Sequence, residues 1–285
     1  MGKIKLITDN KRTIEKAFEE FEKSNTIRGL AEDTKTSYKA TYRAFTEYYN
    51  EDNLCSNLSE ETVEGFIGYL REHREVNNTS INSHLTNVRA FANYCIRLGY
   101  TEDFRIKSVK VEKQIKETYT DSELAILLKK PNLKKCTFVE YRNWVFINYL
   151  MATGNRVSTI INIKIGDIDF DSDSIVLKKT KNKNQQIIPI SNSLKIVLLE
   201  FLKYRKGTGE DYLFCNATGG KMTRDCIKNS IRKYNNKRGI HKTSIHLFRH
   251  TFAKNWILNG RRCIQATKTA WTQKYGHSKR ICKYV

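Results

Sequence analysis

Residues 245–250 read Ile-His-Leu-Phe-Arg-His and open an apolar helical pattern near the end of the chain. His246 and Arg249 are three residues apart, so on a helix they lie on one face. About ninety residues upstream, Arg156 ends the run Thr-Gly-Asn-Arg, in which the glycine is expected to stop one helix and the arginine to open the next. A guanidinium binds phosphate oxygens through paired N–H groups. Two arginines and a histidine from separate elements are therefore predicted to hold one phosphate.

The composition points to a polyanionic partner. The chain has 285 residues, 39% of them hydrophobic, and a net charge of +21. A surplus of this size favours nucleic acid, and the alternative is a solvated lysine-rich surface. No apolar run approaches the roughly 18 residues of a membrane span, and no signal-peptide pattern opens the chain. The seven cysteines show no metal-binding spacing, so we expect reduced thiols, no cofactor and no metal.

The first part of the chain has the apolar periodicity of four amphipathic helices. They are expected at 12–23, at 33–49, from Ser59, and from about Thr79 to Gly99. Together they predict an all-helical domain over 10–105. Residues 106–117 are charge-rich and lack a period, which is typical of a linker.

A second domain is predicted over 118–260. It opens at Thr120 with a capping box completed by Glu123. Apolar runs on either side of a lysine-rich turn predict a β-hairpin from 174–179 and 185–190. The remaining patterns predict helices at 138–151, near 192–205, near 223–236 and near 246–259.

The order of Arg156, a hairpin turn rich in lysine, and His246-x-x-Arg249 resembles the catalytic domain of the tyrosine recombinase (phage integrase) family. The resemblance covers about residues 10–260, and its motifs are specific in combination although each is weak alone. It implies a mainly α protein, with an N-terminal helical (SAM-like) core-binding domain followed by a mostly α catalytic domain that carries a small β-hairpin.

The resemblance also implies a reaction and a role for each residue. A tyrosine hydroxyl attacks a DNA phosphate and leaves a 3′-phosphotyrosyl link and a free 5′-hydroxyl. Arg156 and Arg249 would hold the phosphate, and His246 would donate to it or assist proton transfer. Counting back from the proline after the turn, Lys181 matches the lysine that protonates the leaving oxygen, with Lys183 second. Thr159 departs from the family, whose members usually carry an acidic residue there.

The tail, residues 261–285, departs from the family further. It holds seven Lys or Arg, no Asp or Glu, and no clean helical period. Read from the second base of codon 262, permitted synonymous codons can encode D-V-F-R-L-Q-K-L-L-G-H-R-S-M-D-I-V-R-E-Y-V-N-M, which is the family ending. The family histidine would then stand at Thr272 and the nucleophile at Ile281. We therefore hypothesise a one-base frameshift near codon 261.

The chain as written offers other candidates for these two roles. His277 follows a glycine, but it lies 28 residues after Arg249 against 23 in the restored frame. Tyr284 lies seven residues after His277 against nine in the family, and Tyr275 fits less well. These spacings disfavour His277 and Tyr284 as the working histidine and nucleophile.

The resemblance implies double-stranded DNA as the partner, bound by a C-shaped two-domain clamp. It also implies a homotetramer on paired sites, accessory DNA-bending proteins in some systems, and origin in a mobile element. A cytoplasmic, nucleoid-associated protein without membrane contact is expected. The alternatives are a non-catalytic DNA-binding remnant, a basic transcriptional regulator and an RNA-binding scaffold; a metal nuclease is disfavoured, since no acidic or histidine cluster has ligand spacing.

Overall fold

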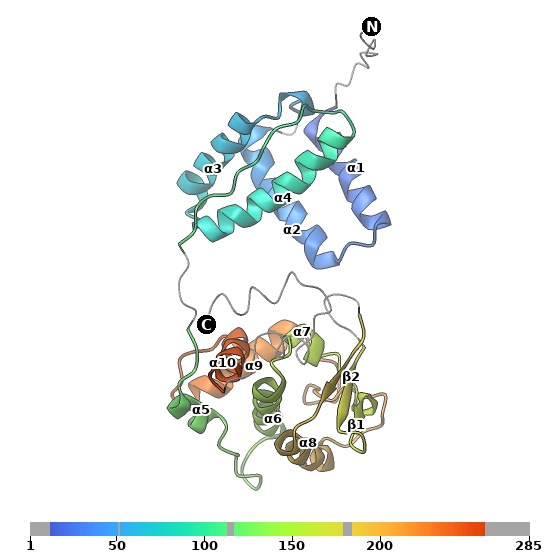
Figure 1. Cartoon of the computed structure of the whole chain (residues 1–285), viewed down its shortest axis with the longest axis vertical. Helices are drawn as coiled ribbons and strands as arrows, with labels where there is room; N and C mark the ends of the chain where they lie inside the picture. The colour runs from blue at the N-terminus through green and yellow to red at the C-terminus, as the bar shows by residue number, and fades with distance from the viewer. Residues whose placement is uncertain (1–11, 51, 113–116, 179–183, 260–285) are drawn as a thin grey trace. The chain divides into compact units, whose positions relative to one another are not determined.

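The computed structural model describes residues 12–50, 52–112, 117–178 and 184–259. The chain divides into two compact units, Met1–Lys113 and Gln114–Val285 (Figure 1). Among the described residues, no helix is long and apolar enough to cross a membrane.

In its described residues, the first unit contains four α-helices and one short 3-10 helix. They are α1 (Ile14–Ile27), α2 (Glu32–Tyr49), η1 (Cys55–Asn57), α3 (Glu60–Arg74) and α4 (Asn78–Arg97). Local chemistry sets the starts of three of them, because Thr13, Ser59 and Asn77 accept backbone N–H groups of the first turns of α1, α3 and α4. The four helices predicted from periodicity are confirmed.

Aromatic rings pack against one another within the largely aliphatic core of this unit. Phe18 stacks on Tyr42 with ring centroids 3.9 Å apart, and Phe21 and Phe91 meet edge to face at 5.7 Å. The segment 106–112, which the sequence interpretation assigned to the linker, lies along α4. Asn82 bonds both the N–H and the carbonyl of Val109, at 2.8 and 2.7 Å, and Ile106 is buried.

The second unit contains six α-helices, one 3-10 helix and three strands in its described part. In order they are α5 (Asp121–Leu127), α6 (Phe138–Thr153), α7 (Val157–Ile160), η2 (Ile165–Asp167), β1 (Ile168–Asp169), β2 (Ser174–Leu177), β3 (Gln186–Pro189), α8 (Asn192–Arg205), α9 (Arg224–Asn236) and α10 (Ile245–Leu258). The capping box at Thr120 forms as predicted, with Glu123 bonding back to the Thr120 N–H. A mainly α fold with a small sheet is confirmed.

The predicted hairpin forms as β2 and β3, with Ile175 opposite Ile188. The sheet is antiparallel and has the order β1-β2-β3. The two-residue strand β1 was not predicted, since so short a segment shows no alternation.

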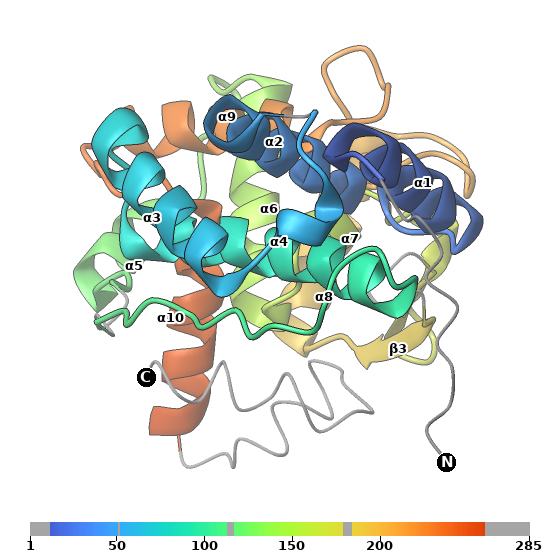
Figure 2. The same ribbon diagram turned by 90° about the horizontal axis from the view of Figure 1, so that it is seen from above.

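Helix α6 runs through the middle of the second unit, and α8, α9 and α10 pack around it (Figure 1, Figure 2). Its apolar residues are therefore buried on all sides, from Val145 to Leu150. Even Arg142 is buried, and it donates to the Cys215 carbonyl at 2.7 Å and to the Ser230 hydroxyl at 2.8 Å. This central helix ends at the turn that carries Arg156.

Candidate functional site

The turn between α6 and α7 places Arg156. Gly154 caps α6 in the left-handed conformation, with φ +59°, which glycine adopts without the steric cost of a side chain. Asn155 is buried and donates to the Tyr149 hydroxyl at 3.1 Å, which anchors the turn. Arg156 then stands as the N-cap residue of α7 and is half-buried.

Helix α10 packs directly on this turn. A Cβ built on Gly154 would overlap the ring of Phe252, so this helix can approach only a glycine. The Arg249 guanidinium donates to the Gly154 carbonyl. The glycine thus has two functions, because it turns the chain toward Arg156 and lets the helix of Arg249 come close.

Arg249 reaches the turn that carries Arg156, because the carbonyl that it binds lies two residues before Arg156. Burial and then the charge of Arg156 lower the pKa of Arg249 to about 10. Burial also lowers the pKa of Arg156. Two partly desolvated cations that repel each other are costly for the folded state, and such pairs are typical of sites that receive an anion.

His246 lies in the first turn of α10 and is exposed. It is three residues before Arg249, so both lie on the same side of the helix. The intervening Phe248 is fully buried and fixes the opposite side. The helix thus presents His246 to the surface beside the half-buried Arg249.

Several predicted site residues lie outside the described residues. They are Lys181, Lys183, Tyr275, His277 and Tyr284. The strands that lead into and out of the lysine turn are described, and they end at Leu177 and begin again at Gln186. The predicted roles of these residues stay predictions.

Thr159 is the position at which the chain departs from the expected acidic residue. It is buried, and its hydroxyl has no hydrogen-bond partner among the described residues. The short helix α7 therefore supplies no carboxylate at this position.

The sequence interpretation missed one buried carboxylate of the second unit. Asp167 accepts from the Lys164 N–H at 2.8 Å and pairs with Lys178 at 2.7 Å. Lys178 is the last described residue before the lysine turn. The only local signal was a polar residue at the start of an apolar run, which does not distinguish a buried acid from an exposed one.

Comparisons with known proteins cover nearly the whole chain. Residues 105–279 match the model described as the phage integrase family, and residues 10–111 match the phage integrase SAM-like domain. The first match extends past residue 260, into the segment that we predict to be out of frame. The tyrosine recombinase XerD of Oceanobacillus iheyensis is 26% identical over 246 residues, which is 82% of this chain and 81% of that protein.

Two solved structures share the fold. The Tn1549 transposon integrase in complex with a circular intermediate DNA has a TM-score of 0.74 and 17% identity, over 94% of each chain. The lambda integrase tetramer bound to a Holliday junction has a TM-score of 0.71 and 14% identity, over 96% of this chain and 78% of that one.

Proposed function

The chain belongs to the phage integrase family, and we propose that its Arg156 and Arg249 hold the DNA phosphodiester that this family of strand transferases cuts and rejoins. The observation that carries the proposal is that Arg249 of α10 binds the Gly154 carbonyl in the turn of Arg156, with both arginines half-buried. The charge of Arg156 helps to lower the pKa of Arg249. A phosphate between them would offset their repulsion and accept bidentate hydrogen bonds.

The reaction would build negative charge on the phosphate oxygens that this arginine pair binds. A tyrosine oxygen forms a bond to phosphorus while the bond from phosphorus to the 5′-oxygen breaks, so the protein is left joined to the 3′-phosphate. Charge builds on the two non-bridging oxygens, where Arg156 and Arg249 would stabilise it. His246 would donate to the same phosphate or carry the proton of the attacking hydroxyl, and Lys181 would protonate the departing 5′-oxygen.

The surface next to Arg156 supports a path for the DNA backbone. An open pocket of about 450 Å³ adjoins α7 and the start of α9, and its lining includes Ser158, Asn162, Lys221 and Arg224. The residues Lys221 and Arg224 are exposed. Two cations around a pocket that also includes Ser158, two residues after Arg156, would suit the phosphates that follow the scissile one along a strand.

Binding of DNA tests the phosphate role. Replacing Arg249 by methionine keeps an unbranched, flexible stem and removes the charged guanidinium, so we expect weaker binding of a fluorescein-labelled duplex. The plot of log affinity against log salt should become less steep by about one. Arg232→Met removes one exposed charge from α9 and serves as the control. Equal effects of the two substitutions would refute a specific phosphate contact at Arg249.

The covalent step needs a tyrosine nucleophile, and the family's tyrosine is missing from the chain as written. We propose that a one-base frameshift near codon 261 explains its loss. The source DNA should be sequenced from codon 255 to about 50 codons past Val285. A different base count that restores Leu-Gly-His and its tyrosine would make this an active recombinase with a wrongly recorded ending. If the DNA encodes the chain as written and the shifted reading frame continues downstream, the gene is a disrupted integrase. If neither holds, the frameshift proposal is refuted.

A covalent adduct distinguishes an active chain from a DNA-binding remnant. A nicked duplex releases its short 5′-hydroxyl strand after cleavage and traps any phosphotyrosyl link, which a denaturing gel detects. An adduct that Tyr284→Phe abolishes would identify Tyr284 as the nucleophile. Intact DNA binding without any adduct would support the remnant.

We further propose a tetramer on paired DNA sites, by analogy with the lambda integrase tetramer on its junction, together with a mobile-element origin and association with the nucleoid. Accessory DNA-bending proteins would act on the same DNA. Light scattering of the chain with and without a paired site tests the assembly, and a single bound copy at saturation would refute it.

A further inference from the structure

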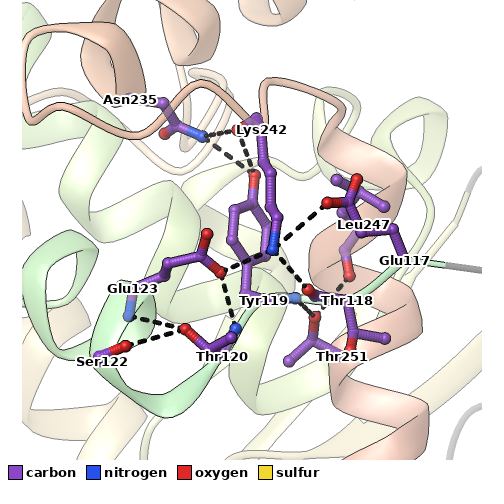
Figure 3. A network of polar contacts seen from close by, with 10 residues as sticks. All are labelled: Glu117, Thr118, Tyr119, Thr120, Ser122, Glu123, Asn235, Lys242, Leu247 and Thr251. Carbon is purple, nitrogen blue, oxygen red and sulfur yellow. Dashed lines mark hydrogen bonds and ion pairs between the residues drawn. The ribbon is translucent and has the colours of Figure 1, made fainter.

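A polar network joins the start of the second unit to helix α10 (Figure 3). We give the name clasp to four residues of this network, Glu117, Tyr119, Glu123 and Lys242. Three of them lie between Glu117 and Glu123, at the start of the described part of the second unit, and the fourth lies three residues before α10. The clasp residues therefore meet across more than a hundred residues of sequence.

Tyr119 contacts the inner face of α10. Its backbone N–H donates to the Thr251 hydroxyl at 2.9 Å, and that hydroxyl donates to the Leu247 carbonyl at 2.8 Å. Its ring lies against Phe248, with centroids 4.4 Å apart. Phe248 directly precedes Arg249, so these contacts fix the rotation of the helix at the point where Arg249 leaves it.

Lys242 holds the other end of the same segment. Its ammonium donates to Glu123 at 3.0 Å and to the Thr118 carbonyl at 3.2 Å, and it pairs with Glu117 at 3.3 Å. The Lys242 carbonyl accepts from the Tyr119 hydroxyl at 2.8 Å. Both the main chain and the side chain of Lys242 are thus bound to the segment that begins at Glu117.

We propose that the clasp positions Arg249 for phosphate binding, with Lys242, Glu117 and Glu123 acting as positioning residues. This rests on the proposed function of Arg249. The guanidinium must meet the phosphate in a planar, bidentate geometry, which a small rotation of α10 would spoil. Partly exposed ion pairs contribute little to stability on average, so the two carboxylates on one ammonium are better explained by orientation than by the strength of the fold.

Neutralising Glu117 and Glu123 distinguishes an effect on the orientation of Arg249 from an effect of the protein's overall charge. Glu117→Gln with Glu123→Gln keeps an oxygen for the Thr120 N–H but removes both ion pairs. Loss of two negative charges alone should tighten DNA binding. Loss of the clasp should instead raise the dissociation constant for a labelled duplex roughly threefold to tenfold, the range of effects at residues that act through another group. Glu200→Gln on α8, which breaks the ion pair of Glu200 with Lys130, is the matched control and should not weaken binding.

The same substitutions in an Arg249→Met background decide whether the effect passes through Arg249. If it does, the two neutral glutamines no longer weaken binding once Arg249 is gone, whereas a general loss of structure would remain. Lys242→Met should behave like the double glutamine variant, and Lys242→Arg should bind like wild type. Thermal unfolding of each variant verifies that it is folded.

Binding that is unchanged or tighter in the double glutamine variant would overturn the positioning role, as would equal weakening with and without Arg249. If Arg249→Met itself leaves the dissociation constant unchanged, the proposed phosphate site fails, and the positioning role fails with it. If Arg249→Met weakens binding and the double glutamine variant does not, only the positioning role of the clasp is overturned.

Discussion

Replacing Gly154 by alanine tests the packing that brings Arg156 and Arg249 together. The residue has φ +59°, and an added Cβ would overlap the Phe252 ring. The left-handed conformation costs an alanine about 1–2 kcal/mol, and displacing a packed ring costs about 1–3 kcal/mol more. The free energy of unfolding should therefore fall by roughly 2–5 kcal/mol.

Urea unfolding followed by tryptophan fluorescence measures this loss of stability in the second unit, which contains Gly154. The tryptophans Trp144, Trp256 and Trp271 all belong to the second unit. Gly239→Ala is the matched control, because φ is +73° there and nothing lies within 4 Å of an added Cβ. It should lose only the left-handed cost of about 1–2 kcal/mol.

A second variant isolates the ring. With Phe252→Ala already present, Gly154→Ala has nothing to displace, so its additional cost should fall to that of the control. If Gly154→Ala costs no more than Gly239→Ala, or if removal of the Phe252 ring leaves its cost unchanged, the close approach of α10 does not explain this glycine. DNA affinity should fall with Gly154→Ala even where the protein stays folded, since Arg249 loses its place beside Arg156.

Three further outcomes are expected. Arg249→Met should raise the melting temperature, because it removes a desolvated cation that Arg156 repels; inorganic phosphate should stabilise the wild type and not this variant. Burial and then the charge of Arg74 lower the pKa of His84, so the unfolded chain takes up the proton first as the pH falls. The protection factors of the α4 amides, which correct for the intrinsic pH dependence of hydrogen exchange, should therefore fall below about pH 6.5, and His84→Gln should flatten this dependence. Asp167→Ala removes the carboxylate that pairs with Lys178 and should lower the urea-unfolding free energy by about 1–3 kcal/mol.

Much of the fold follows from local sequence. The capping box at Thr120 forms as predicted, and the helix predicted near 192–205 is α8 with the same bounds. The apolar runs around the lysine turn form β2 and β3. Caps, helical period and strand alternation depend on neighbours within about four residues, so they can be read without the tertiary structure. The family motif at His246 and Arg249 spans four residues, so it can also be recognised without the tertiary structure.

Contacts between distant segments were decided by tertiary packing. The bond from Arg249 to the Gly154 carbonyl joins residues 95 apart, and the bond from Tyr119 to Thr251 joins residues 132 apart. No local pattern marks Thr251 or Lys242 as partners of the segment after the linker, because each reads as an ordinary polar residue on or before a helix. The sequence by itself determined most of the elements, although not the short strand β1, and it predicted which residues suit a phosphate. Only the folded core, which sets α10 against a glycine at the end of α6, brings Arg249 to the turn that carries Arg156.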